Sequence, residues 1–198
     1  RRFDPSGSSN FIMSPTLLFV PGLRDHVEDH WQTIYARKIP GSHSVPPLQT
    51  DKLSRSARVE ALQNALNRID GPVILVAHSA GVMITVHWAQ EYLRPIHGAL
   101  LAAPADLESP MPQAYPQTEQ LAEHGWLPIP RDPLPFPSIV AASTNDPLAR
   151  YERVEQMARD WGSTLVAVGA VGHLNPAAGF GEWAQAEALV LRLCERSA

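Results

Sequence analysis

The sequence predicts an α/β fold, in which a mostly parallel sheet carries helices on both of its faces. Three observations support this prediction. Short runs of β-branched and other apolar residues recur along the chain, and several are apolar on both faces, as interior parallel strands are. Segments of about a dozen residues with helical periodicity alternate with these runs. The length of 198 residues suits one domain.

The first part of the chain provides two clear strands and two helices. Thr16 to Val20 is a continuous apolar run that stops at Pro21-Gly22, which indicates a buried strand ending in a turn. Residues 55–69 form the clearest helix, because Val59, Leu62 and Leu66 recur there at helical spacing. The remaining elements expected here are a helix over 27–38, a short strand within 42–48 and a strand over 72–77.

The second part continues the alternation and then interrupts it once. The elements expected are helices over 79–93, 148–161 and 182–195 and strands over 96–102, 137–142 and 164–168. These bring the sheet to about six strands. Nine of the 19 prolines fall between Pro104 and Pro137. A proline-rich segment of this length inside a compact domain predicts a functional loop or lid over 104–136, the alternative being a surface excursion without a role.

Composition excludes several classes of function. The net charge of −4 and pI of about 6.1 give no electrostatic footprint for nucleic acid. No run approaches the ~18 apolar residues of a membrane span, so a soluble protein is expected. The single cysteine, Cys194, cannot form an internal disulfide and indicates a cytoplasmic location. The polar residues 1–14 are expected to be a disordered or cloning-derived extension, with residues 15–198 as the domain, and the oligomeric state stays open.

The most informative residues are Ala77 to Gly81, between an expected strand and an expected helix. A nucleophilic serine at such a turn requires small residues two positions before and two after it, and Ala77 and Gly81 meet this steric requirement around Ser79. Alanine replaces the commoner glycine at the first of these positions. The alternative is that Ser79 only caps the following helix.

A serine hydroxyl needs a hydrogen-bonded imidazole to become a good nucleophile. Among the eight histidines, only His173 stands in a loop just after the last expected strand, at the same sheet edge as Ser79. The imidazole in turn needs a carboxylate to fix its tautomer. Asp146 follows the preceding strand and is the preferred candidate, while Asp106, after the strand before that, is the rival. Either choice gives the order serine, acid, histidine of the α/β-hydrolase fold.

Stabilisation of the oxyanion is assigned to two backbone N–H groups. Ala80 opens the helix after Ser79, where free N–H groups and the positive end of the helix dipole point at the site. Leu23, in the loop after the first strand, is the second candidate, because Gly22 before it permits an unusual turn. These assignments predict acyl transfer to Ser79 followed by hydrolysis of a small-molecule substrate, with no metal and no organic cofactor.

Five sets of residues together resemble the YdeN-like, retinoblastoma-binding-protein-9-like serine hydrolases, a family of small α/β hydrolases. They are Phe19-Val20-Pro21-Gly22 with His30-Trp31, Ala77 to Gly81, Ala103 to Asp106, Ser143 to Pro147, and Gly172 to Asn175 with Gly179, Gly181 and Trp183. The resemblance implies a minimal version of the fold, with Ser79 as nucleophile, Asp146 as acid and His173 as base. It also implies a generally undefined substrate.

Two alternatives to a serine hydrolase follow from the same residues. His26 and His30 are four residues apart and could share a zinc ion on a helix, but the glutamate is one place late for H-E-x-x-H and no third ligand suggests itself. The fold could also serve as a non-catalytic binding module. If the site is catalytic, the sequence does not separate ester, thioester and amide substrates. Candidate pocket residues are His30, Trp31, His78, Asn145 and Asn175.

Overall fold

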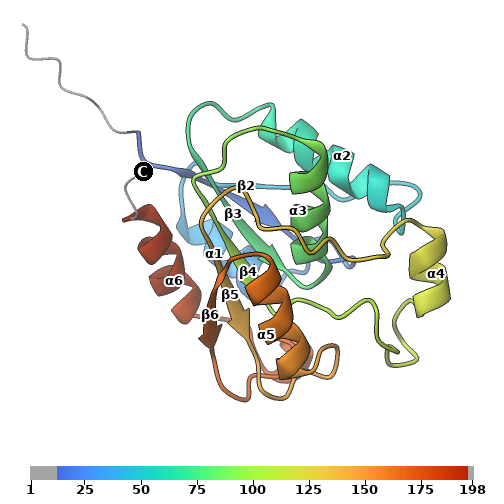
Figure 1. Cartoon of the computed structure of the whole chain (residues 1–198). Helices are drawn as coiled ribbons and strands as arrows, with labels where there is room; N and C mark the ends of the chain where they lie inside the picture. The colour runs from blue at the N-terminus through green and yellow to red at the C-terminus, as the bar shows by residue number, and fades with distance from the viewer. Residues whose placement is uncertain (1–12, 196–198) are drawn as a thin grey trace, which may run out of the picture.

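The computed structural model describes residues 13–195 of the chain, and one six-stranded sheet forms its centre (Figure 1). All strand pairs are parallel, and the spatial order is β2-β1-β3-β4-β5-β6. The strands are β1 (Thr16–Val20), β2 (His43–Ser44), β3 (Val73–His78), β4 (Gly98–Ala102), β5 (Ser138–Ala142) and β6 (Thr164–Ala167). The prediction of a parallel α/β sheet with about six strands is therefore confirmed.

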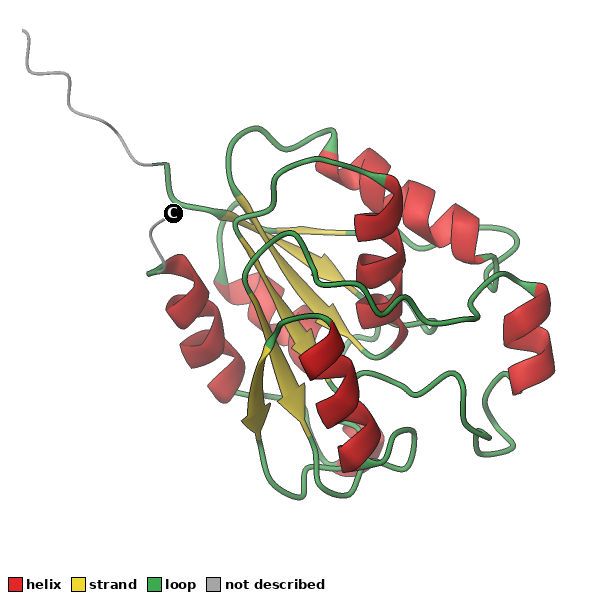
Figure 2. Ribbon diagram, viewed as in Figure 1, coloured by secondary structure: helices red, strands yellow, loops and turns green. Residues whose placement is uncertain are grey.

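Helices cover both faces of the sheet, so the domain has three layers (Figure 2). The helices are α1 (Trp31–Lys38), α2 (Arg55–Leu66), α3 (Ala80–Glu91), α4 (Thr118–Glu123), α5 (Tyr151–Asp160) and α6 (Gln185–Cys194). Helices α2, α3 and α5 contribute to the larger hydrophobic core on one face, while α1 and α6 contribute to a second core on the other.

Successive residues of each strand enter opposite cores, because side chains along a strand alternate between the two faces. In β1, Leu18 and Val20 belong to the larger core, whereas Leu17 and Phe19 belong to the second. All six residues of β3 are buried. This two-sided burial is the physical reason why the sequence of β3 is apolar on both faces.

Two helices differ most from the sequence-based expectation, while the short strand expected within 42–48 is present as β2 and the other elements lie within three residues of their expected bounds. Helix α1 begins at Trp31 and not at residue 27, because Nδ1 of His30 accepts a hydrogen bond from the N–H of Gln32 and so caps the helix there. Strand β2 has only two residues, among neighbours that include prolines, which cannot donate to a ladder. Helix α4 was not expected at all. The expected extension of residues 1–14 lies outside the described residues, apart from Met13 and Ser14.

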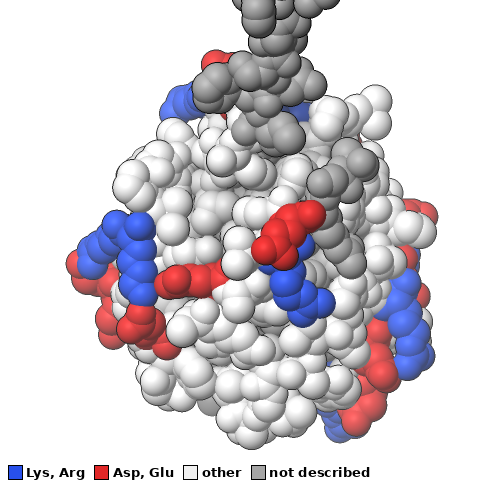
Figure 3. Space-filling view, turned by 90° about the vertical axis from the view of Figure 1, so that its left-hand side faces the viewer, with Lys and Arg blue, Asp and Glu red and all other residues white. Residues whose placement is uncertain are grey.

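The surface carries charges of both signs. On the face turned to the viewer in Figure 3, Lys and Arg side chains lie beside Asp and Glu side chains, outside the part that grey atoms cover. Examples of such pairs in the structure are Lys38 with Glu182 and Arg37 with Glu28. Within residues 13–195, no helix has the length and apolar character needed to cross a membrane.

Candidate active site

The sheet topology creates a crevice at the carboxyl ends of the strands. From β1 the chain proceeds to β2 on one side, and β3 then pairs with β1 on the other side. Ligands of open α/β sheets bind at such a point of reversal, just outside the strand ends. The loop after β1 and the turn after β3 therefore border the crevice, and they contain Leu23 and Ser79.

Ser79 occupies the sharp turn between β3 and α3. Its backbone has φ 58° and ψ −123°, a conformation that residues other than glycine rarely adopt. Gly81 is required beside it, since a Cβ there would lie 2.1 Å from the carbonyl oxygen of Val20. Ala77 is fully buried at the end of β3, where its methyl group is accommodated. The steric reasoning thus holds strictly for position 81 and loosely for position 77.

The side chain of Ser79 points to an imidazole. Nε2 of His173 lies 2.8 Å from Oγ of Ser79, and Nδ1 of the same ring lies 2.8 Å from Oδ2 of Asp146. An ionised carboxylate only accepts hydrogen bonds, so Nδ1 carries the proton and Nε2 is free to accept the serine hydroxyl. The serine hydroxyl makes no hydrogen bond that caps α3. Ser79 therefore occupies the N-cap position of α3, but its hydroxyl does not cap the helix.

Two contacts hold the loop that carries His173. Oδ1 of Asn145, next to Asp146, accepts a hydrogen bond of 2.7 Å from the N–H of Gly172. Nε2 of His78 lies 2.8 Å from the carbonyl oxygen of His173, and since a carbonyl only accepts, His78 is protonated on Nε2. The end of β3 and the loops after β5 and β6 are thereby tied together around the imidazole.

His78 and His30 form a buried, uncharged layer behind His173. The ring centroid of His78 lies 4.6 Å from that of His30 and 4.9 Å from that of His173. Burial, reinforced by the neighbouring charge of His173, lowers the pKa of His30 to about 4. The same two causes hold the pKa of His78 well below its ordinary value. Both rings are therefore neutral near pH 7, and neither competes with His173 for a proton.

Leu23 and Ala80, the two residues expected to stabilise an oxyanion, lie close to Ser79. A Cβ on Gly22 would lie 3.4 Å from Cβ of Ser79, so the loop after β1 lies against the serine. Ala80 is the first residue of α3, where backbone N–H groups have no partner within the helix. Both Leu23 and Ala80 line the cavity described next.

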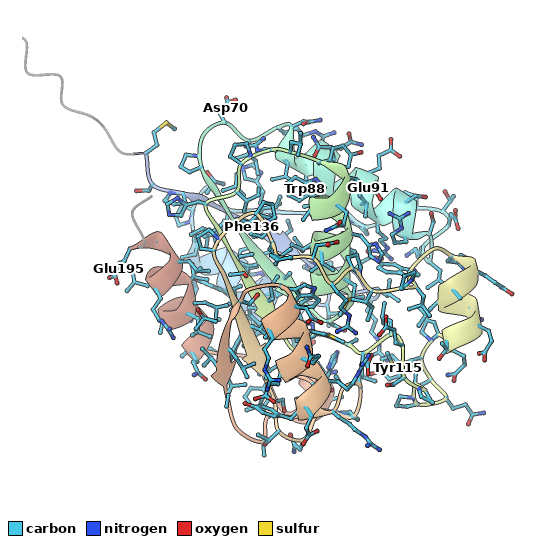
Figure 4. All side chains as sticks on the ribbon, viewed as in Figure 1. Asp70, Trp88, Glu91, Tyr115, Phe136 and Glu195 are labelled. Atoms are coloured by element: carbon cyan, nitrogen blue, oxygen red, sulfur yellow. The ribbon has the colours of Figure 1, made fainter. Side chains whose placement is uncertain are left out.

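A cavity of about 640 Å³ opens beside Ser79 and His173. The loop after β1 and the segment around Val45 and Pro46 form one side of it. The proline-rich segment forms another side, with Leu107, Met111, Tyr115 and Leu121 among its lining residues. Figure 4 labels Tyr115 on the loop that precedes α4. The expected loop or lid over 104–136 is thus a wall of the cavity.

In a comparison with known proteins, residues 17–192 of the chain match the family model described as "Serine hydrolase". The chain belongs to this serine hydrolase family. A YdeN-like hydrolase from Pectobacterium atrosepticum is 32% identical, with a TM-score of 0.76, and the match covers 92% of this chain and 91% of that one. The expected membership among YdeN-like α/β hydrolases is confirmed.

More distant structures share the fold of this serine hydrolase. The ydeN gene product of B. subtilis is 14% identical with a TM-score of 0.71, and the match covers 92% of this chain and all of that one. Est1E from Butyrivibrio proteoclasticus is 10% identical with a TM-score of 0.66, covering 94% and 91% of the two chains. A comparison with curated protein sequences finds no match.

The rival carboxylate of the serine hydrolase, Asp106, is engaged elsewhere. Its oxygens accept hydrogen bonds from Nε and Nη2 of Arg153, at 2.9 and 3.1 Å, and from the hydroxyl of Ser109. Burial would raise the pKa of Asp106, but the hydrogen bonds from Arg153 and Ser109 outweigh it and lower the pKa. His173 bonds to Asp146 instead.

The candidate pocket residues divide into two groups. His30, His78 and Asn175 line the cavity. Trp31 does not, because its ring packs edge-on against Trp183 in the second core, with centroids 4.9 Å apart. Asn145 does not either, since its side chain turns to Gly172. Three of the five candidate pocket residues therefore line the cavity, while Trp31 and Asn145 lie outside its lining.

The idea of a zinc site at His26 and His30 fails on geometry. Both residues precede α1, so they do not share a helical face, and His26 is exposed beside Glu28. The described residues 13–195 contain no group of three or more His, Cys, Asp or Glu that could hold a metal ion.

The sequence did not predict which residues form the wall of the cavity. Leu107, Met111 and Tyr115 stand in the proline-rich segment, where no helical or strand period shows which side chains point inward. The only available signal was the presence of large apolar side chains among so many prolines. The role of His78 in holding the carbonyl of His173 was also missed.

Proposed function

We propose that this serine hydrolase cleaves an ester, thioester or amide of a small molecule through an acyl-enzyme on Ser79. The observation that carries the proposal is the position of His173, whose two ring nitrogens lie 2.8 Å from Ser79 and from Asp146. This relay matches the geometry of nucleophile, base and orienting acid in acyl-transfer enzymes.

The proposed reaction has two halves. His173 removes the proton of Ser79 as the hydroxyl attacks the carbonyl carbon, and then returns that proton to the leaving group. In the second half, His173 activates a water molecule that attacks the acyl-enzyme and releases the acid. Asp146 stays ionised and stabilises the imidazolium that forms in each half. No step requires a metal or an organic cofactor.

We assign stabilisation of the negative charge that develops on the substrate's carbonyl oxygen to the N–H groups of Ala80 and Leu23. A preorganised donor aimed at such an oxyanion contributes about 3 kcal/mol to the stabilisation of the transition state in comparable enzymes. The strained turn at Ser79 supports this assignment, because it places the hydroxyl at the start of α3, next to the N–H of Ala80.

The test is labelling with a fluorophosphonate probe, which reacts with activated serines. Wild type should be labelled, and Ser79→Ala should lose both the label and about 10⁴-fold or more of the ester turnover. Ser56→Ala is a matched control, since Ser56 is an exposed residue of α2 that does not line the cavity. Equal turnover in Ser79→Ala would reject the assignment, and a folded wild type that neither reacts nor turns over any ester would point to a binding module.

A further inference from the structure

We propose that the cavity beside Ser79 is an acyl site for uncharged, apolar acyl groups longer than acetyl, contacting the wall formed by the proline-rich segment. This inference rests on the proposed function, because it assigns the part of the substrate that becomes attached to Ser79.

The size of the cavity is the first argument. Its volume of about 640 Å³ lies in the middle of the range of small-molecule sites, ~300–1,000 Å³. An acetyl group on Ser79 would leave most of the wall uncovered. A longer acyl group would remove additional apolar surface from water, and this burial stabilises the complex in proportion to the area covered.

The second argument is the chemistry of the wall. On the side of the proline-rich segment and the loop after β5, the lining includes Leu107, Met111, Tyr115, Leu121 and Leu148. Val45, Pro46 and Pro47 line the side formed by the segment after β2. Both sides are therefore suited to hydrocarbon.

The third argument is that the charged side chains that line the cavity are few, and they are either paired or exposed to solvent. Among the described lining residues, only Arg24 and Asp25 belong to the Lys, Arg, Asp and Glu types. Asp25 is paired with Arg58 and, at 3.7 Å, with Lys52. Arg24 is exposed, with its guanidinium carbon 5.8 Å from the ring centroid of Tyr115. A charged acyl group inside would lose its hydration without gaining a buried partner, which is costly.

Gln32, another polar residue of the lining, is also committed. Its Nε2 donates hydrogen bonds to the carbonyl oxygens of Val20, at 3.2 Å, and of Val76, at 2.9 Å. Its amide N–H groups thus serve the fold. The neutral rings of His30 and His78 provide no charge either.

The fourth argument is that the wall is part of the folded domain. Leu107 and Leu121 are 3% and 1% exposed, and both belong to the larger core. The segment is held by Trp126, whose ring N–H donates to the carbonyl oxygen of Leu53 at 2.7 Å. It is also held by ion pairs of Glu108 with Arg131 and Arg153. The apolar wall is therefore present before a substrate binds.

The test is a series of p-nitrophenyl esters with acetyl, butyryl, hexanoyl and octanoyl groups. Because the leaving group is constant, kcat/KM reports the acyl site. Full burial of each methylene corresponds to about a threefold to fourfold rise, so hexanoyl should exceed acetyl by roughly 10²-fold. The hemisuccinate ester, whose four-carbon acyl group has a carboxylate in place of the terminal methyl of butyryl, should be at least about tenfold slower than the butyryl ester.

Two variants locate the acyl group. Met111→Trp places a larger side chain on the wall and so narrows the cavity. It should therefore lower the ratio of hexanoyl to acetyl kcat/KM at least about tenfold. Leu93→Trp is the control, because Leu93 is 98% exposed and lies beyond the far end of α3, and it should leave the ratio unchanged. If Met111→Trp does not fold, Tyr115→Ala replaces it and should also lower the ratio by removing contact area.

The outcomes separate this inference from the proposed function. If Ser79 is labelled but acetyl is cleaved as well as hexanoyl, or the hemisuccinate as well as butyryl, the acyl-site proposal is overturned and the hydrolase proposal stands. An unchanged ratio in folded Met111→Trp and Tyr115→Ala overturns the assignment to this wall. If Ser79 is not labelled and no ester reacts, the proposed function itself has failed.

Discussion

Two carboxylates at neighbouring strand ends have different surroundings in this molecule. Asp106 follows β4 and Asp146 follows β5, and their side chains are 1% and 3% exposed. Asp106 pairs with Arg153, which projects from α5, whereas Asp146 pairs with His173 from the loop after β6. The two positions are almost equivalent in the topology, yet their partners differ in kind.

The difference shows that the partner, and not the place along the sheet, determines what a carboxylate does. A guanidinium is permanently charged, so its pair with Asp106 is a fixed anchor for the proline-rich segment. An imidazole can gain and lose a proton near neutral pH, so a carboxylate bound to it can stabilise the protonated ring whenever that form is present. Three predictions test this division between an anchoring loop and a loop that we propose to be catalytic.

The largest effect is expected from Asp146→Asn. The amide keeps the size of the side chain but removes the charge that orients and stabilises the imidazolium, so kcat should fall by about 10⁴-fold. Ester turnover measures the loss, and urea unfolding should show a free energy of unfolding close to that of wild type. A fall in kcat of less than tenfold would show that Asp146 does not act on His173, and the contrast with Asp106 would then fail.

The second prediction uses pH to compare the buried His30, behind the imidazole of His173, with the anchoring carboxylate of Asp106. The pKa of His30 falls from 6.5 to about 4 on folding, so the unfolded chain binds more protons between these values. The stabilising effect of neutral His30 is complete above pH 6.5 and is lost as the pH falls towards 4, by roughly 3 kcal/mol. The pKa of Asp106 lies below its ordinary 3.8, so its contribution is present above that pH and is lost only below it.

Urea unfolding at a series of pH values measures both windows. His30→Asn keeps a side chain that can cap α1 but cannot titrate, so it should make the profile between pH 6.5 and 4 shallower, leaving the pH dependence that comes from His78 and His87. Asp106→Asn should change the profile only below about pH 4. A His30→Asn profile parallel to wild type would show that His30 is not held neutral by the fold.

The smallest effect is expected from Asp106→Asn at pH 7. It removes the buried charge from the pair, but Arg153 is 37% exposed and can be hydrated, so the free energy of unfolding should fall by only about 1–2 kcal/mol. The value of kcat should change less than about threefold. A loss of kcat as large as that of Asp146→Asn, in a protein that remains folded, would transfer the acid role to Asp106.

Much of this fold could be predicted, because its signals are local. Strands β1, β3 and β5 differ from their predicted ranges by at most one residue at each end, since buried parallel strands are continuous apolar runs. Helix α4 escaped prediction because it has six residues among prolines, and its capping box of Gln117 and Gln120 is a weak pattern. The start of α1 depends on the cap at His30, which apolar periodicity does not reveal.

The site was predictable where a residue type and a strand end coincide, as at Ser79, Asp146 and His173. It was not predictable where the direction of a side chain decides. Trp31 and His30 are adjacent, but one ring packs in the core and the other lines the cavity. Asn145 and Asn175 illustrate the same limit, since one amide secures a loop and the other borders the cavity.

The uniform direction of the six strands has a practical consequence. Every loop that lines the crevice leaves the sheet at one edge, so the turns at the opposite edge can be altered independently of it. Strand β3 has six residues, and each adds about 3.3 Å to the length of the strand. The carboxyl and amino ends of the strands are therefore roughly 15–20 Å apart. The turn at Gly162, just before β6, has open space around it, so an affinity sequence could be inserted beside this glycine, which should itself be kept because its φ of +67° disfavours other residues.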